Sequence, residues 1–168
     1  DLFDRLPTPY GLVRGGVAPD HQTIKKVVRT YERMATGDGV RFFGNVTFGT
    51  DITLEDVLAR YDAVVYAFGC ETGRTLGIDG EDLGGVHSAA EFVYWYNGHP
   101  DYADRPFDLS AVRRAIVVGN GNVSMDVARI LAQDVDSLRG TDSADHAIAV
   151  LENSAIEEIV ILGRRGLA

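Results

Sequence analysis

Apolar and polar positions along the first 68 residues predict short strands and helices in alternation. Residues 1–21 indicate the end of a strand followed by a loop rich in glycine and proline. Apolar residues then recur at helical spacing over residues 22–35, at Ile24, Val27, Val28, Tyr31 and Met34. Thr53 and Asp56 match a capping box, which predicts that a helix begins there. The remaining expected elements are strands at 40–43, 46–48 and 62–68, the last of them buried, and a helix over 54–61.

The second part of the chain has a different pattern, with one long loop and then longer elements. Residues 70–110 read mostly as loop, with a short aromatic-rich helix near 89–96. A strand that begins at Ala115 runs into a glycine-rich turn and then into an apolar-periodic helix. The expected apolar face of that helix consists of Val123, Val127, Ile130 and Leu131. A helix over 144–151 and a strand over 156–162 follow, and the polar stretch at 72–80 suggests two domains, residues 1–73 and 74–168.

The composition, net charge and cysteine count argue against several classes of function. The 168 residues are 45% apolar and 24% charged, as in a globular protein, and the net charge of −9 disfavours a nucleic-acid surface. No apolar run approaches the ~20 residues that a membrane helix needs. The single cysteine, Cys70, excludes an internal disulfide and fits a reducing compartment, so we expect the cytoplasm, or the mitochondrial matrix in a eukaryote. Because two parallel strands cannot bury both faces of a sheet, we expect an internal piece of a longer protein.

The segment from Ala115 to Val127, AIVVGNGNVSMDV, is the most informative part of the chain. Gly119, Gly121 and Ser124 fill the G-x-G-x-x-G/A template between a strand and a helix. In that geometry the first backbone N–H groups of the helix, and its dipole, face a pyrophosphate. A purely structural glycine turn is the alternative.

Two arginines after the next strand indicate which dinucleotide is bound. Arg164 and Arg165 stand where an NAD-binding domain usually carries an acid for the ribose hydroxyls. Two cations favour a 2′-phosphate instead, and therefore NADP(H). A methyltransferase, the competing ligand class, would also want an acid there. A solvated strand end is the other alternative.

The spacing between the glycine loop and the arginines is about twice the usual ~20 residues. We therefore expect residues 134–155 to form an insertion that leaves the two strands adjacent. Asp126 falls in the first turns of the phosphate-facing helix, where it would repel a pyrophosphate. Its side chain should point sideways, towards solvent or towards the reacting rings.

Five motifs carry a resemblance to one family: PYGLVRGGVAPDH, FFGNVTFG, WYNGHPD, GNGNVSMDVARIL and GRRG. With them the chain resembles the adrenodoxin reductase-type ferredoxin–NADP reductases, including actinobacterial members, over essentially its whole length. The resemblance implies an α/β fold of tandem dinucleotide-binding, Rossmann-like domains. Residues 1–73 would be a partial FAD-binding domain that lacks its first βα unit, and residues 74–168 a partial NADP-binding domain.

The resemblance also implies the reaction, in which electrons pass from NADPH to FAD and then singly to a ferredoxin-type iron–sulfur protein. The implied FAD-binding residues are Asp4, Leu12 and Phe48. The implied NADP-binding residues are Gly119, Asn120, Gly121, Asn122 and Val123 in the loop, with Arg164 and Arg165 at the 2′-phosphate. His21 and Asp126 match residues near the flavin and nicotinamide. A loop histidine next to a helix start, with Asp20 as the cap, is the alternative for His21.

Some residues are expected to have structural roles only, and one motif expected for FAD binding is missing. Trp95 and Tyr96 are expected to pack in the core, and Cys70 to be a buried small residue. The glycine motif that would cradle the FAD pyrophosphate is absent, so we expect the 168-residue chain alone to bind FAD poorly. An electron-input subunit like that of glutamate synthase, or an NADP(H)-binding fragment without turnover, remain alternatives. We expect neither a nucleic-acid nor a membrane partner, and the acidic balance shows no basic patch for docking a ferredoxin.

Overall fold

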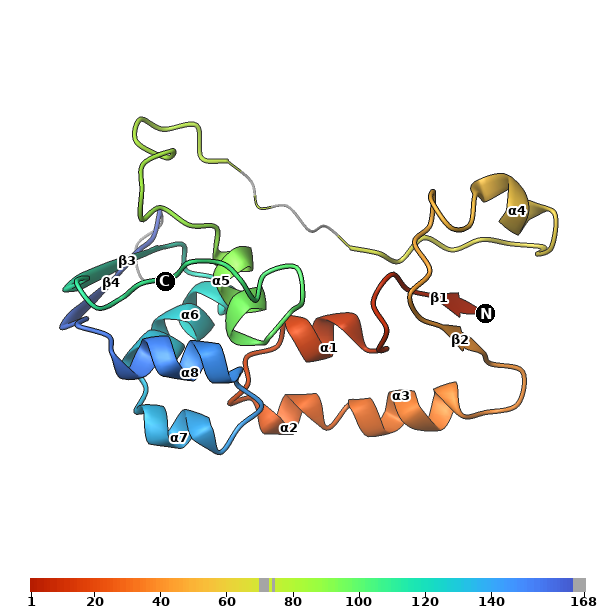
Figure 1. The fold of residues 1–168 in the computed structure, drawn as a ribbon, viewed down its shortest axis with the longest axis horizontal. Helices are drawn as coiled ribbons and strands as arrows, with labels where there is room; N and C mark the ends of the chain where they lie inside the picture. Colours follow the sequence, from red (N-terminus) through yellow and green to blue (C-terminus); the bar gives the residue numbers. More distant parts are fainter. Residues whose placement is uncertain (70–72, 74, 165–168) are drawn as a thin grey trace. The chain divides into compact units, whose positions relative to one another are not determined.

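The computed structural model describes residues 1–69, 73 and 75–164, which form two compact units (Figure 1). The first unit comprises Asp1–Arg14 and Thr23–Cys70, and the second comprises Gly15–Gln22 and Glu71–Ala168. The short segment Gly15–Gln22 belongs to the second unit by its contacts, although the chain on both sides of it belongs to the first.

The first unit is built around two short parallel strands, β1 (Leu2–Phe3) and β2 (Phe42–Phe43). The rings of Phe3 and Phe43 stack with centroids 5.2 Å apart, which joins the strands through their side chains as well as their backbones. The helices between the strands are α1 (Gly11–Gly15), α2 (Gln22–Lys25) and α3 (Val28–Ala35). The helix expected over 22–35 is therefore interrupted between α2 and α3. The expected loop contains α1, which is too short to show a periodic apolar stripe.

Two further expectations in the first unit need correction. Residues 46–48 do not form a strand, because the chain turns at Asn45 (φ +57°) and Phe48 makes only an isolated bridge with Ile52. The helix expected over 54–61 ends earlier, as α4 (Leu54–Leu58). Its capping box is confirmed: the Thr53 hydroxyl accepts from the Asp56 backbone N–H at 3.1 Å, and the Asp56 carboxylate accepts from the Thr53 N–H.

The prediction of a buried strand at residues 62–68 is wrong. Val65 is 86% exposed and Phe68 is 77% exposed, and no described strand pairs with this segment. β-branched and aromatic residues favour a strand because their side chains pack well on a pleated surface. A strand forms only where a neighbouring backbone takes up its N–H and C=O groups, and the described residues offer none here.

The second unit contains the longer parallel pair, β3 (Arg114–Val118) and β4 (Glu158–Leu162). Their register places Arg114 opposite Glu158, and these two side chains form an ion pair across the strands. The crossover consists of α6 (Asn122–Ala132), α7 (Val135–Arg139) and α8 (Asp145–Glu152). The adjacency of the two strands across a long crossover is thus confirmed. The extra helix α7, which Asp134 caps, was not predicted.

The core of the second unit lies where α5 (Ala89–Tyr96), α6 and α8 pack together and α6 covers the β3–β4 pair (Figure 1). Trp95 and Tyr96 are almost completely buried, which confirms their packing role. The face of α6 was predicted correctly at Val127 and Ile130, which are buried. Val123 is 51% exposed and does not belong to the core, because it lies in the first turn of α6, beside the glycine loop.

Two classes of site find no support in the part of the chain that the structure describes. None of its helices is long and apolar enough to cross a bilayer. Among the same residues, no group of three or more histidine, cysteine, aspartate or glutamate side chains is arranged to hold a metal ion.

Candidate functional site

The glycine loop connects the end of β3 directly to the start of α6. Gly119 has a φ of +130°, and its N–H donates to the Leu162 carbonyl at 2.8 Å. The positive φ favours glycine, and a β-carbon here would lie 2.7 Å from the Ser124 hydroxyl oxygen, which would have to turn away. Ser124 thus makes the close helix–strand contact that the template assigns to a small residue.

The N-terminus of α6 has no side-chain cap. Its N-cap is Gly121, which has no side chain, and no acidic residue lies in the first turn. Thr53, Ser88 and Asp134 cap α4, α5 and α7 with their own side chains, whereas α3 and α8, like α6, have no side-chain cap. The first N–H groups of α6, at Asn122 and Val123, are therefore left without a side-chain cap, where the helix dipole favours negative charge.

The end of β4 meets this loop. A β-carbon on Gly163 would overlap the side-chain amide of Asn120, so that amide covers the Gly163 backbone. Arg164 follows at once and is exposed. Arg165, the second arginine of the expected 2′-phosphate site, lies outside the described residues. The structure thus brings Gly119–Val123 and Arg164 to one edge of the β3–β4 pair, an arrangement suited to a diphosphate with a further phosphate nearby.

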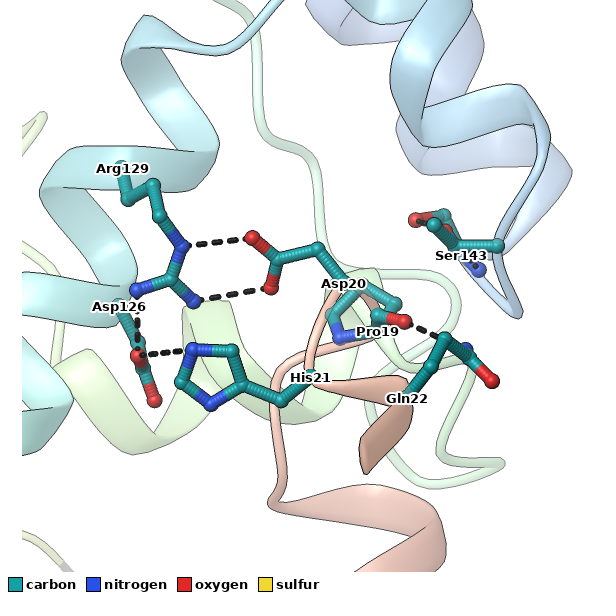
Figure 2. A network of polar contacts seen from close by, with 8 residues as sticks. Pro19, Asp20, His21, Gln22, Asp126, Arg129 and Ser143 are labelled. Atoms are coloured by element: carbon teal, nitrogen blue, oxygen red, sulfur yellow. Dashed lines mark hydrogen bonds and ion pairs between the residues drawn. The ribbon is translucent and has the colours of Figure 1, made fainter. Parts of the chain in front are cut away.

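His21 and Asp126 come together from distant parts of the sequence, within the second unit. His21 Nε2 lies 3.8 Å from Asp126 Oδ1, and the side chains are 34% and 18% exposed. Asp126 is on the second turn of α6 and points sideways to His21 and Arg129, as Figure 2 shows. The expected sideways orientation is therefore correct. The two side chains are thus within ion-pair distance of each other.

Arg129 completes this cluster, and sequence reasoning did not single it out. Its Nε and Nη2 donate to the two carboxylate oxygens of Asp20 at 2.6 and 2.8 Å, and its Nη1 donates to Asp126 Oδ1 at 2.8 Å. The hydrogen bond from Arg129 holds the pKa of Asp20 below its ordinary value. Asp20 thus serves this ion pair rather than a helix cap. The three-residue spacing of Asp126 and Arg129 on one helix was the available sequence signal.

The residues expected at FAD lie in the first unit. Asp4 directly follows β1; its N–H donates to the Phe43 carbonyl at 3.0 Å and its carboxylate accepts from the Leu6 N–H at 2.9 Å. Leu12 lies on α1 and is 73% exposed, and Phe48 is 41% exposed with its ring edge-on to Tyr66. Asp4 thus occupies the carboxyl end of a parallel strand, the usual place for a ligand-binding acid in such a sheet.

Comparison with known proteins finds extensive similarity along the whole chain, although no family model matches. The chain is 52% identical over 166 residues to NADPH-ferredoxin reductase FprA of Mycobacterium leprae, covering 99% of the chain and 36% of that relative. It is 48% identical over 166 residues to the mitochondrial NADPH:adrenodoxin oxidoreductase of Arabidopsis thaliana, covering 99% of the chain and 34% of the relative. The chain thus spans about a third of the length of these relatives.

The fold agrees with a solved structure as closely as the sequence does. FprA of Mycobacterium tuberculosis, solved in complex with NADPH, superposes with a TM-score of 0.94 at 51% identity. The match covers 98% of the chain and 36% of that protein. The α/β, Rossmann-like fold class expected from the sequence is therefore confirmed.

Proposed function

This chain belongs to the adrenodoxin reductase-type ferredoxin–NADP reductases, and we propose that its protein passes electrons from NADPH through FAD to a ferredoxin-type iron–sulfur protein. The observation that carries the proposal is that the uncapped α6 N-terminus and Arg164 lie at the same edge of the β3–β4 pair, where the glycine loop contacts the end of β4. Whole-length similarity to NADPH-dependent reductases supports it. The chain spans about a third of those proteins, so the complete activity also depends on residues outside it.

The residues at the loop fit an NADP diphosphate. Gly119 and Gly121 leave the backbone free of side chains, and the N–H groups of Asn122 and Val123 begin a helix with no acidic residue in its first turn. The side chain of Asn120, which belongs to this loop, lies against Gly163, the residue before Arg164. In the proposal Arg164, with Arg165, binds the 2′-phosphate through charge-assisted hydrogen bonds.

FAD is proposed for the first unit, with Asp4 at the ribose and with Leu12 and Phe48 beside the nucleotide. The position of Asp4 at the end of β1 supports this assignment. The proposed domains are residues 1–73 for FAD and 74–168 for NADP. When bound, the two cofactors supply the hydride and single-electron chemistry. The protein's own contribution is to bind and orient their rings.

His21 and Asp126 are proposed to work where the nicotinamide meets the flavin. Hydride transfer needs aligned rings and little water more than a strong acid or base. The His21 imidazole lies 3.8 Å from the Asp126 carboxylate, and both side chains are partly buried, so in the proposal they supply polar groups near the rings. Asp126 lies on the second turn of α6, and His21 lies in segment 15–22. The first turn of α6, where the phosphate is proposed to bind, therefore contains no acidic residue.

The arginine pair gives the decisive experiment, made on the full-length protein. Changing Arg164 and Arg165 together to glutamine should weaken NADPH binding by about 1.5–3 kcal/mol per lost charge-assisted contact and leave NADH binding nearly unchanged. The matched control is Arg139→Gln, an exposed arginine of the second unit that is paired with Glu152 and Asp136. Equal losses of affinity for NADPH and NADH would contradict the assignment.

Turnover separates this proposal from the two alternatives. Ferredoxin-dependent reduction of cytochrome by the full-length protein with NADPH is the expected result. If the protein oxidises NADPH only when a glutamate-forming partner subunit is present, the electron-input role is favoured. If it binds NADPH without turnover, a non-catalytic role is favoured. For the compartment we propose the cytoplasm, or the mitochondrial matrix in a eukaryote, which the mitochondrial relative from Arabidopsis supports.

A further inference from the structure

The segment Gly15–Gln22 packs within the second unit, although it is joined at both ends to chain of the first. Ala18 and Pro19 are completely buried there. A β-carbon at Gly15 would lie 3.4 Å from the His99 ring and 3.5 Å from the Tyr94 ring, so the backbone approaches this aromatic pair closely. The segment therefore holds a defined position, and it carries both Asp20 and His21.

Arg129 is the side chain that joins this segment to Asp126. One guanidinium donates two hydrogen bonds to Asp20 and a third to Asp126, so three of its five N–H groups are used (Figure 2). The side chains are well shielded, at 35% exposed for Arg129, 12% for Asp20 and 18% for Asp126. Charge-assisted, bidentate contacts of this kind fix geometry as well as adding energy.

Other contacts also dock the segment, but they do not reach Asp126. Gln22 Nε2 donates to the Pro19 carbonyl at 2.7 Å and to Asp142 Oδ1 at 2.9 Å. The buried Ala18 and Pro19 add apolar contact. Of these hydrogen bonds, the one to Asp142 joins the segment to the rest of the unit. Among the described residues, Arg129 binds both Asp20, which directly precedes His21 in the chain, and Asp126, whose carboxylate faces His21.

We propose that Arg129 is a positioning residue for hydride transfer, which holds His21 against Asp126 by binding Asp20 and Asp126 together. This inference rests on the proposed function. Because His21 directly follows Asp20, fixing the Asp20 carboxylate fixes the backbone from which the imidazole projects. The same guanidinium donates to Asp126 Oδ1, the carboxylate oxygen that His21 Nε2 also faces. A misplacement of ~1 Å at such a site costs on the order of 10²-fold in rate.

The geometry of the guanidinium is required, and its charge alone does not suffice. Lysine has one compact ammonium and cannot reproduce the parallel pair of hydrogen bonds to Asp20 while reaching Asp126. Arg129→Lys should therefore behave like Arg129→Gln in rate while disturbing the charge balance less. Arg139→Lys is the matched control, because Arg139 also bridges two carboxylates of this unit, at Asp136 and Glu152, away from His21.

The experiment follows flavin reduction by saturating NADPH in rapid mixing, on the full-length flavoprotein, with the NADPH Kd and Tm measured in parallel. We expect Arg129→Lys and Arg129→Gln to slow the saturated rate roughly 10- to 100-fold and to change Kd less than about threefold. Arg139→Lys should leave the rate unchanged. Rates of the Arg129 variants within twofold of wild type overturn the inference.

A double variant separates positioning from general destabilisation. If Arg129 acts through His21, Arg129→Gln should slow a His21→Gln protein far less than it slows the wild type. An equal slowing in both backgrounds overturns the inference, since it reports a structural loss that is independent of His21. Asp20→Asn, which keeps the Arg129–Asp126 contact, should give a smaller slowing than Arg129→Gln. Failure of the wild type itself to reduce flavin with NADPH would instead defeat the proposed function.

Discussion

The side-chain amide of Asn120 occupies the space that a β-carbon on Gly163 would need. Asn120 belongs to the loop between β3 and α6, and Gly163 lies between β4 and Arg164. Their contact, together with the hydrogen bond from the Gly119 N–H to the Leu162 carbonyl at 2.8 Å, joins the proposed phosphate loop to the arginine-bearing strand end. The two parts of the proposed NADP site are thus in direct contact with each other.

Gly163→Ala should weaken NADPH binding because the new methyl group displaces Asn120 from the loop. We expect a roughly 10-fold or larger rise in the NADPH Kd, the effect of losing about one charge-assisted contact, measured by fluorescence titration. Gly140→Ala is the matched control. Its β-carbon would lie 3.7 Å from the nearest atom, the Ser137 carbonyl oxygen, an ordinary contact. Unchanged NADPH affinity in Gly163→Ala would show that the Asn120 position does not matter.

Asp20→Asn should lower stability in a pH-dependent way. The hydrogen bond from Arg129 lowers the pKa of Asp20 in the folded protein. The ionised carboxylate therefore contributes stability above its unfolded pKa of about 4, and that contribution is lost as the pH falls through the lower folded value. At pH 7 the variant should be less stable by about 1–3 kcal/mol. The difference in Tm between wild type and variant should shrink below about pH 4; a difference that stays constant would contradict the ion pair.

Tyr96→Phe should be neutral or stabilising, although Tyr96 is 1% exposed. Among residues 1–69, 73 and 75–164 its buried hydroxyl has no hydrogen-bond partner, and burial raises the pKa of the phenol, with the Asp126 charge adding to this. Removing an unpaired buried hydroxyl relieves a desolvation cost of about 1–3 kcal/mol. Urea unfolding of the full-length protein measures the change. Tyr61→Phe is the contrast, because the Tyr61 hydroxyl bonds to Asp1 and its loss should not stabilise the protein. A clear loss of stability in Tyr96→Phe would mean that the hydroxyl has a partner.

Several features were predictable because local sequence decides them. The strand before Gly119, the turn and the start of α6 follow from β-branched residues, glycines and helical apolar spacing within some fifteen residues. The capping box at Thr53 and Asp56 was equally local. In these cases the residues that determine the conformation are close neighbours along the chain.

The tertiary structure alone decided the features that depend on contacts between distant residues. The strand pattern at 62–68 has no partner strand among the described residues, so its preference is not expressed. Segment 15–22 joins the second unit because Ala18 and Pro19 are buried there and Asp20 meets Arg129, 109 positions away along the chain. Burial and ion pairing depend on distance in space, and a periodic pattern contains no information about that distance. The sequence predicts which residues bind a nucleotide phosphate, whereas only folding brings Asp20 and His21 to Asp126 and Arg129 on α6.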